Sequence, residues 1–211
     1  KGDYCLFLNP DCLIRPDTVA KMLDVMESRP EAGIAGCVIR NPDGSEQAGC
    51  RRRIPALWSG FGRAFGLEGF FRKIARYSPI DMAWDPLPRD ITEVEAISGA
   101  FMFVRRSAME KIGYLDDKYF LHCEDLDWCM RFRQGGYLIL FVPKAEITHF
   151  KGVSSATRPI SVEWHKHRGM LRFYRKFLLD RYPLPVVGLV SAGVWLRFGM
   201  VAARRTLRRL L

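Results

Sequence analysis

The sequence predicts an α/β domain followed by a basic helical extension. Tyr4–Leu8 is a short apolar run, which is typical of a strand buried on both faces of a sheet. Apolar residues at helical spacing then predict a helix from Pro16 to about Ser28, and a strand is expected over Ile34–Arg40. The chain has 211 residues, of which 48% are hydrophobic, so one domain can bury a sizeable core.

Further elements are expected after residue 94. They are a strand over Glu95–Val104, a short helix from Ser107 to Gly113, a longer helix from Glu124 to Gly135 and a strand over Ala145–Thr148. The short helix prediction depends on Ser107 and Glu110, which are spaced as a capping box. Residues 54–94 mix aromatic residues with Gly, Pro and basic residues. This mixture predicts either a mobile, partly helical insertion or a satellite hydrophobic cluster under a long loop.

Three carboxylates gather at the start of the longer helix. Glu124, Asp125 and Asp127 lie in its first turn, where the positive end of the helix dipole favours acids. A carboxylate at such a position suits a general base. The alternative is that these acids only cap the helix.

Two further residues fit metal chemistry. Asp11 follows directly after the first strand, and the carboxyl ends of strands are where open α/β sheets bind ligands. A carboxylate there can bind Mg²⁺ or Mn²⁺ while phosphate and water supply the other ligands. His149 follows the last strand, and its imidazole could complete the metal shell. An ordinary turn at Asp11 and a structural histidine at position 149 are the alternatives.

Five segments, taken in order, carry a resemblance to a known family. They are Leu8–Asp11, Asn41–Gln47 with Arg51–Pro55, Ser98–Ser107, Glu124–Asp127, and His149 with Gly152 and Ser154. With these segments the chain resembles the family 2 glycosyltransferases, bacterial enzymes of the GT-A fold, and particularly the rhamnosyltransferase-like group that builds surface polysaccharides. The resemblance implies a GT-A-type mixed sheet flanked by helices.

The resemblance also implies roles for individual residues. Asn9–Asp11 takes the place of the family's Asp-x-Asp metal motif, and Asn9 stands where the family has its first aspartate. This departure leaves Asp11 as the only carboxylate of the motif, with Asn9 as a substrate-binding residue. By the same resemblance, His149 is the late metal ligand and Asp125 is the catalytic base.

The reaction implied is an inverting transfer from a nucleotide-sugar donor to a glycan or lipid-linked acceptor. A divalent cation, Mg²⁺ or Mn²⁺, would stabilise the departing diphosphate, while Asp125 would accept the proton of the attacking hydroxyl. Glu124 and Asp127 would orient the substrates. Gly99, which lacks a side chain, would let a sugar approach the backbone or would simply allow tight packing. The subgroup suggests dTDP-rhamnose as the donor.

The chain begins close to the proposed metal motif. Lys1 directly precedes the first strand, whereas the resembled family has nucleotide-binding βαβ units before that point. We therefore expect residues 1–160 to be a catalytic domain without its N-terminal nucleotide-binding part. Such a chain, taken alone, would bind donor weakly or be inactive.

The net positive charge concentrates at the C-terminal end. Residues 161–211 hold 11 of the 33 Lys and Arg residues but only 2 of the 23 Asp and Glu residues. Within them, residues 186–203 are almost wholly apolar, with Arg197 near the middle. We expect residues 162–211 to bind an anionic membrane surface through a helix lying in the interface. The alternatives are a single transmembrane helix near 186–203, of marginal length, and a soluble helix packed on the domain.

The cysteines indicate the compartment. The chain has six, without a Cys-x-x-Cys pair and mostly in apolar segments, so we expect reduced, buried thiols. This predicts a cytoplasmic protein, held peripherally at the inner face of the cell membrane.

Three other functions compete with glycosyl transfer. The formal charge of +10 suggests a nucleic-acid-binding protein, but the basic residues flank an apolar helix instead of forming a broad polar patch, so no nucleic acid is expected. A non-catalytic membrane-binding remnant is the second alternative. The third is a cation-dependent nucleotidyltransferase, which the Glu124–Asp125 helix and the late His149 argue against.

Overall fold

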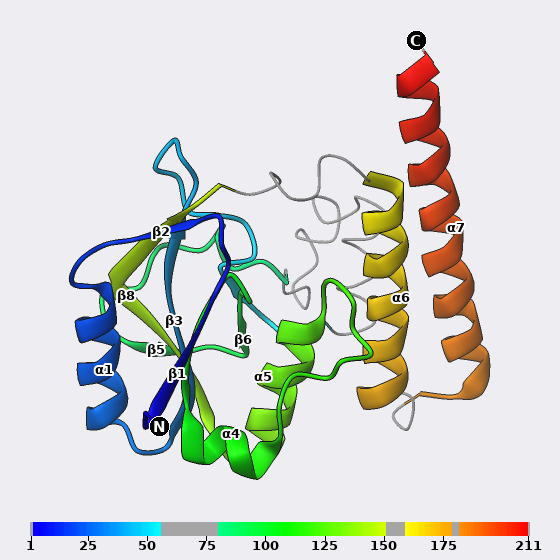
Figure 1. The fold of residues 1–211 in the computed structure, drawn as a ribbon. Coiled ribbons are helices and arrows are strands. Elements are labelled where there is room, and N and C mark those ends of the chain that lie inside the picture. Colours follow the sequence, from blue (N-terminus) through cyan, green and yellow to red (C-terminus); the bar gives the residue numbers. More distant parts are fainter. Residues whose placement is uncertain (1, 56–79, 151–158, 179–181, 211) are drawn as a thin grey trace. The chain divides into compact units, whose positions relative to one another are not determined.

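The structure is a computed structural model that describes residues 2–55, 80–150, 159–178 and 182–210 (Figure 1). Most of the insertion predicted within residues 54–94, together with Gly152 and Ser154, lies outside these ranges. The chain divides into two compact units. The first comprises Lys1–Ile54, Ile80–Asp116 and Asp125–Val153, and the second comprises Pro55–Pro79, Asp117–Glu124 and Ser154–Leu211.

The first unit is built on a mixed sheet. Its strand order is β1 (Tyr4–Leu8), β7 (Phe101–Arg105), β3 (Ala32–Arg40), β8 (Leu138–His149) and β2 (Cys12–Ile14), and β5 (Thr92–Glu93) also pairs with β8. β3 and β8 are parallel, whereas β1, β2 and β5 pair with antiparallel neighbours. A second small sheet joins β4 (Arg51–Arg52) to β6 (Ala96–Ile97). The mixed α/β sheet expected from the sequence is therefore confirmed.

The core lies around the central strands. The first eight residues of β3 are all buried, as is expected of a strand covered on both faces. Phe101, Phe141 and Trp128 are fully buried beside it, and each such side chain contributes roughly 1.5–3 kcal/mol through the removal of apolar surface from water. Continuous apolar runs in the sequence therefore place the sheet correctly.

The helices of this unit begin close to their expected positions. α1 (Thr18–Ser28) buries Met22 and Met26, and the Thr18 hydroxyl donates a 2.8 Å hydrogen bond to the Glu146 carbonyl of β8. α5 (Glu124–Gln134) matches the predicted acidic helix. β8 extends further towards its N-terminal end than the predicted Ala145–Thr148 and ends at His149.

The predicted capping box is wrong. α4 (Arg106–Ile112) already includes Ser107, and its N-cap is Arg105, which makes no side-chain cap hydrogen bond. The reason is that β7 runs directly into α4, and the Arg105 side chain instead donates to the backbone carbonyls of Met26 and Ala32. The helix does end at Gly113, which has a φ of +92°.

The predicted strand over Glu95–Val104 is divided in two. Residues 98–100 form a turn between β6 and β7, in which the Ala100 N–H donates to the Ser98 hydroxyl over 3.3 Å. Gly99 consequently lies in a turn and not in a strand. The two halves pair with different strands, which the apolar pattern alone does not reveal.

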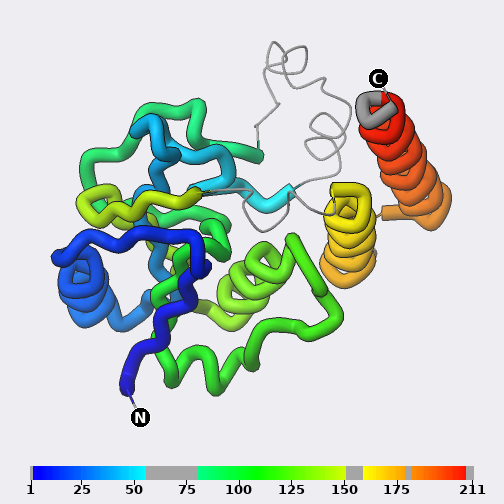
Figure 2. The backbone as a smooth tube through the Cα atoms, turned by 45° about the horizontal axis from the view of Figure 1, so that its top comes forward, coloured from blue at the N-terminus to red at the C-terminus, as the bar shows by residue number. Residues whose placement is uncertain are grey.

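The second unit contains two long helices. α6 (Pro159–Phe177) and α7 (Leu184–Leu210) lie side by side in both views (Figures 1 and 2). Their contact includes Trp164 of α6, whose ring centroid lies 4.7 Å from that of Trp195 and 5.4 Å from that of Phe198. Residues 184–207 of α7 are long and apolar enough to cross a membrane by length and composition.

Candidate active site

The end of β8 and the start of β2 bring Asp11 and His149 together. In the β2–β8 pair, Cys12 lies opposite His149, and the Asp11 carbonyl accepts a 2.9 Å hydrogen bond from the Phe150 N–H. This register places Oδ1 of Asp11 3.1 Å from Nε2 of His149. The two residues are 138 positions apart in the sequence. Both side chains are largely buried, with exposed fractions of 17% for Asp11 and 9% for His149.

The bend after β1 orients Asp11. The Asn9 N–H donates to the Ala100 carbonyl over 3.0 Å, and the Asn9 carbonyl accepts from the Cys12 N–H over 3.2 Å. Pro10 fixes its own φ within this bend. Asn9 itself is exposed at the strand end. The Asn9–Asp11 sequence therefore forms a turn and also orients the partly buried carboxylate of Asp11.

Cys12 lies in the same cluster. Its Sγ and the side-chain ligand atoms of Asp11 and His149 all lie within 4.8 Å of one another. Burial and the Asp11 charge raise the pKa of the Cys12 thiol to about 11, so it is protonated at neutral pH. Its Sγ–H points to the Ala100 carbonyl, 3.7 Å away. The cluster thus offers a carboxylate oxygen, an imidazole nitrogen and a thiol that a metal ion would have to deprotonate before binding it.

Asp125 is the most tightly held carboxylate of α5. Its Oδ2 accepts a 2.5 Å hydrogen bond from Nη2 of Arg52 and a 2.9 Å bond from the Gly99 N–H, while Oδ1 accepts from the Leu126 N–H at 2.8 Å. Burial raises the pKa of Asp125, but the Arg52 charge and these hydrogen bonds outweigh it and lower the pKa below its ordinary value. Asp125 is therefore ionised at neutral pH.

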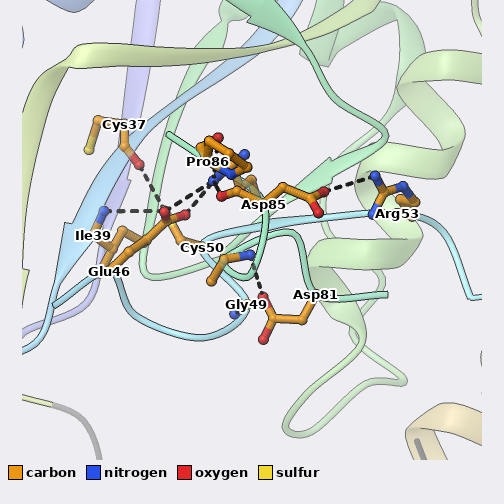
Figure 3. Close-up of polar contacts among 11 residues, drawn as sticks. Cys37, Ile39, Glu46, Gly49, Cys50, Arg53, Asp81, Asp85 and Pro86 are labelled. Atoms are coloured by element: carbon orange, nitrogen blue, oxygen red, sulfur yellow. Dashed lines mark hydrogen bonds and ion pairs between the residues drawn. The ribbon is translucent and has the colours of Figure 1, made fainter. Parts of the chain in front are cut away.

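Arg52 reaches Asp125 from a well-anchored segment. Its Nη2 also donates to the Ile97 carbonyl over 2.5 Å. Polar contacts of the residues before and after Arg52 hold this segment in place, and several of them are drawn in Figure 3. They join Arg51 to Glu46, Arg53 to Asp85, and the Gly49 N–H to the Asp81 carboxylate. These contacts hold β4 in place, and β4 in turn positions the guanidinium of Arg52.

One turn connects the two clusters. The Gly99 N–H binds the Asp125 carboxylate, while the next residue, Ala100, accepts from the Asn9 N–H and from Cys12. The carboxylate of α5 and the cluster at the end of β8 therefore border the same short turn. A pair of groups that could hold a metal and an ionised carboxylate that could accept a proton lie within one compact unit.

A comparison with known families agrees with the fold. A family model described as "Glycosyltransferase like family 2" matches residues 1–165, which is most of the chain. The chain belongs to glycosyltransferase family 2. The expectation drawn from the sequence motifs is confirmed.

Two curated relatives of this family 2 glycosyltransferase are rhamnosyltransferases. The N-acetylglucosaminyl-diphospho-decaprenol L-rhamnosyltransferase of Mycobacterium tuberculosis is 32% identical over 85% of this chain and 56% of that protein. Rhamnosyltransferase WbbL of Escherichia coli K12 is 32% identical over 70% of this chain and 52% of that protein. The chain spans about half the length of these relatives.

A solved structure supports the fold. GalNAc-T7, crystallised with UDP, GalNAc and Mn²⁺, superposes with a TM-score of 0.52 at 14% identity, over 82% of this chain and 31% of that chain. At this identity the likeness concerns the fold, which is of the GT-A type.

The other predicted site residues of this family 2 glycosyltransferase have different surroundings. Gly99 donates its N–H to Asp125, and Glu124, the first residue of α5, is half-buried. Asp127 is fully buried and pairs with Arg131 at 2.7 Å. Arg131 in turn donates to the Tyr114 carbonyl over 2.7 Å, which connects α5 to the segment after α4.

Sequence reasoning did not assign roles to Arg52 or Gln47. Arg52 contacts Asp125, and Gln47 contacts His149, with Oε1 lying 2.7 Å from Nδ1 of the imidazole. Both belong to segments that carried the family resemblance, and that was the available signal. Their partners are 73 and 102 positions away, beyond the reach of a local pattern.

Proposed function

We propose that this chain is the catalytic portion of an inverting glycosyltransferase that uses a nucleotide-sugar donor. The observation that carries the proposal is the meeting of Asp11 with His149 beside the turn that binds Asp125. One site then combines metal-binding groups for a leaving diphosphate with an ionised carboxylate for an acceptor hydroxyl. Family membership supports this chemistry over a nucleotidyltransferase or a nucleic-acid-binding protein.

Asp11 and His149 fit a divalent cation. Two ligands of an octahedral ion lie about 3 Å apart when each is about 2.1 Å from it, and the pair is separated by 3.1 Å. A carboxylate ligand suits Mg²⁺ or Mn²⁺, and imidazole is a common ligand of transition metals, so the pair favours Mn²⁺ over Mg²⁺. The bound ion would neutralise charge on the departing nucleoside diphosphate. Asn9, exposed at the same strand end, is proposed to contact the donor.

Asp125 is proposed as the base. Among the described contacts its Oδ2 is engaged by both Arg52 and Gly99, whereas Oδ1 accepts only the Leu126 N–H. Oδ1 therefore has the capacity to accept a hydrogen bond from an acceptor hydroxyl and then to take its proton. Arg52 and the Gly99 N–H hold the carboxylate in one orientation and keep it ionised. This role requires hydrogen-bond reach more than a raised pKa.

The remaining acids are assigned separately. Glu124 stands one residue before the base and is proposed to orient the acceptor. For Asp127 we propose a structural role, because its carboxylate is buried against Arg131. The Gly99 N–H is proposed to contribute to catalysis by binding the Asp125 carboxylate, and not by close contact with a sugar.

Rhamnose and a lipid-linked acceptor are the proposed substrates. One curated relative is named for L-rhamnose transfer to N-acetylglucosaminyl-diphospho-decaprenol, and another is named as a rhamnosyltransferase. The family model matches residues 1–165, which include Asp11, Asp125 and His149. dTDP-rhamnose is thus the first donor to test. The catalytic function is assigned to residues 1–160.

Residues 161–211 are proposed to hold the protein at an anionic membrane surface. One face of α7 carries large apolar side chains that are 37–75% exposed, namely Val186, Leu189, Leu196, Met200 and Leu207. Their spacing places them on one helical face. Such a face, without any partner among the described residues, suits burial in the lipid interface.

The charges of α7 favour an interfacial helix over a spanning one. Nη1 of Arg197 lies 2.8 Å from Nε2 of His167, and Arg205 binds Glu163 over 3.0 Å, so both arginines turn towards α6. α6 itself exposes basic residues, namely Lys166, Arg168, Arg175 and Lys176. A hairpin with one apolar face and one basic helix would lie along an anionic cytoplasmic surface.

The proposed function is tested with the full-length gene product, because the chain spans about half of its relatives. Transfer to a polyprenyl-diphosphate-linked N-acetylglucosamine is measured with dTDP-rhamnose, UDP-glucose, UDP-GlcNAc and GDP-mannose, each with Mn²⁺ or Mg²⁺. We expect cation-dependent transfer from one donor, with dTDP-rhamnose the first choice. Equal turnover after chelation of divalent cations would contradict the metal site, and the absence of transfer from every donor would contradict the proposed function.

A further inference from the structure

The turn after β3 carries a chain of hydrogen bonds that ends on His149. Nδ1 of His149 lies 2.7 Å from Oε1 of Gln47, and Nε2 of Gln47 donates to Oδ1 of Asn41 over 2.9 Å. Nδ2 of Asn41 donates to the Ser45 hydroxyl over 2.9 Å, and this hydroxyl donates to the Asp43 carboxylate over 2.6 Å. Three side chains thus link the exposed Asp43 carboxylate to the buried His149 imidazole.

The carboxylate fixes the direction of every bond in this chain. Ionised Asp43 can only accept, so the Ser45 hydroxyl donates to it and must itself accept from the Asn41 amide nitrogen. The Asn41 oxygen is then the group left to accept from the Gln47 amide nitrogen. The Gln47 oxygen consequently faces Nδ1 of His149, and an oxygen there requires a proton on that nitrogen.

We infer that residues 41–47 form a hydrogen-bond relay that holds the proton of His149 on Nδ1 and leaves Nε2 as an acceptor directed at Asp11. Gln47 is thereby a positioning residue of the metal site. This inference rests on the proposed function, because orienting Nε2 affects the reaction only if His149 binds a cation. The relay orients the nitrogen that would bind the cation, as partners of metal-bound histidines commonly do.

The arrangement around Nε2 fits this assignment when a cation is bound. With Nε2 as an acceptor, the imidazole and the Asp11 carboxylate present two electron-rich atoms 3.1 Å apart. Two acceptors at that separation repel each other, and a cation bound between or beside them would offset the repulsion. Over the whole residue, Gln47 is 4% exposed and His149 is 7% exposed, so water competes weakly for these bonds. Nε2 of Gln47 also lies 3.3 Å from the His149 carbonyl, which further restricts rotation of the amide.

Backbone hydrogen bonds stabilise this turn independently of the side chains that form the relay. The Gly44 N–H donates to the Asn41 carbonyl and the Asn41 N–H donates to the Ser45 carbonyl, each over 2.9 Å. Gly44 has a φ of +84°, which favours glycine at that position. The Gln47 N–H then donates to the Ile39 carbonyl over 2.8 Å and returns the chain to β3. Side-chain variants can therefore alter the relay while the turn persists.

The first test determines which nitrogen of the His149 imidazole carries the proton. Protein labelled with ¹⁵N-histidine is studied by long-range ¹H–¹⁵N correlation, without metal and with Mg²⁺, and His149 is assigned by loss of its signals in His149→Ala. We expect a protonated Nδ1 in both states of the wild type. In Gln47→Met, which neither accepts nor donates at this position, we expect a mixture of the two tautomers. An unprotonated Nδ1 in the wild-type protein would overturn the relay.

The second test measures Mn²⁺ affinity by electron paramagnetic resonance titration. Gln47→Met is expected to bind Mn²⁺ at least about tenfold more weakly than the wild type. Gln47→Glu loses the amide donor to Asn41 but keeps an acceptor facing Nδ1, so its affinity should stay close to that of the wild type. Ser45→Ala interrupts the relay while retaining the turn, and we expect an affinity between these two. Equal affinity in Gln47→Met and the wild type would also overturn the inference.

The two tests separate this inference from the proposed function. A protonated Nδ1 in a protein that binds no Mn²⁺ would contradict the metal site and leave the relay intact. Mn²⁺ binding that is lost in Asp11→Asn, together with an unprotonated Nδ1, would support the metal site and reject the relay. Thermal unfolding of each variant identifies any that fail to fold, and Gln47→Glu then remains as the matched comparison.

Discussion

Nη2 of Arg52 lies 2.5 Å from Oδ2 of Asp125, joining residues 73 positions apart. The exposed fractions of the two side chains are 15% and 12%, so both charges are largely removed from water. The pair keeps Asp125 ionised although burial alone would raise its pKa. Arg52 therefore supports both the stability of this unit and the proposed base.

Replacing Arg52 by Gln should destabilise the protein by about 3 kcal/mol, because it leaves a buried charge without its partner. The pKa of Asp125 is lowered in the folded state, so the contribution of the pair is fully present above about pH 4. It is lost as the pH falls through that lowered pKa. Urea unfolding at several pH values should therefore show the difference between Arg52→Gln and wild type narrowing in acid.

Arg53→Gln is the matched control. Arg53 also binds an aspartate, Asp85, but the two side chains are 31% and 41% exposed. A pair of this kind contributes less than about 1 kcal/mol. Equal losses at neutral pH from Arg52→Gln and Arg53→Gln would contradict the importance assigned to the Asp125 contact.

Asp127→Asn should affect stability and leave substrate affinity unchanged. Asp127 is fully buried and binds Arg131, so loss of its charge is expected to cost about 2–3 kcal/mol. Glu110→Gln removes a comparable but exposed i,i+4 partner of Arg106 and should cost less than about 0.5 kcal/mol. Urea unfolding measures both losses. A raised KM for the acceptor without a loss of stability in Asp127→Asn would instead support substrate binding by this residue.

Gly169→Ala should disturb the segment that precedes the base. A Cβ at Gly169 would lie 2.8 Å from the His122 carbonyl oxygen. His122 and Cys123 already have φ values of +65° and +70°, which are uncommon for residues other than glycine, so this backbone has little freedom to move. Displacement of the segment leading to Asp125 is expected to lower kcat by roughly tenfold to a hundredfold. Steady-state kinetics of the full-length protein measures the effect.

Gly188→Ala provides the comparison for that variant. A Cβ at Gly188 would meet nothing within 4 Å, so the same substitution causes no clash there. Alanine should stabilise α7 by up to about 1 kcal/mol because of its higher helix propensity. If the two variants had the same kcat, the contact between Gly169 and His122 would have no bearing on catalysis.

Charges placed on the apolar face of α7 should release the protein from membranes. Leu189→Asp and Leu196→Asp introduce a carboxylate where the side chains are 75% and 62% exposed. We expect at least tenfold weaker binding to vesicles containing anionic lipid, measured by co-sedimentation, because a charge opposes burial of this face in the interface. Ser161→Asp adds the same charge to an exposed position of α6 and should change binding much less. Undiminished binding of both leucine variants would contradict the proposed membrane face.

The order of the main elements could be predicted because it depends on local patterns. Tyr4–Leu8 is a continuous apolar run, and α5 combines an acidic first turn with a glycine stop, so each was recognisable on its own. The division of residues 95–104 into β6, a turn and β7 was not predictable in this way. Ala96 and Phe101 are both buried, but they lie on strands that pair with different partners.

The candidate site could be predicted as a set of residues but not as an arrangement. Asp11, Asp125 and His149 could be singled out as candidates because each lies near the end of a strand or the start of a helix. Their supporting partners, Arg52 and Gln47, were missed because those contacts depend on pairings formed only in the folded chain. The capping box failed for a related reason, since β7 continues directly into α4.

The most direct test of the proposed chemistry compares Asp125→Asn with Asp11→Asn in the full-length protein, measuring sugar transfer and Mn²⁺ affinity on the same samples. Asp125→Asn should bind Mn²⁺ as the wild type does but transfer sugar about 10²–10⁴-fold more slowly, because the amide accepts no proton. Asp11→Asn should lose both Mn²⁺ affinity and transfer. Transfer at the wild-type rate by Asp125→Asn would contradict its role as the base, and unchanged Mn²⁺ affinity in Asp11→Asn would contradict the metal site.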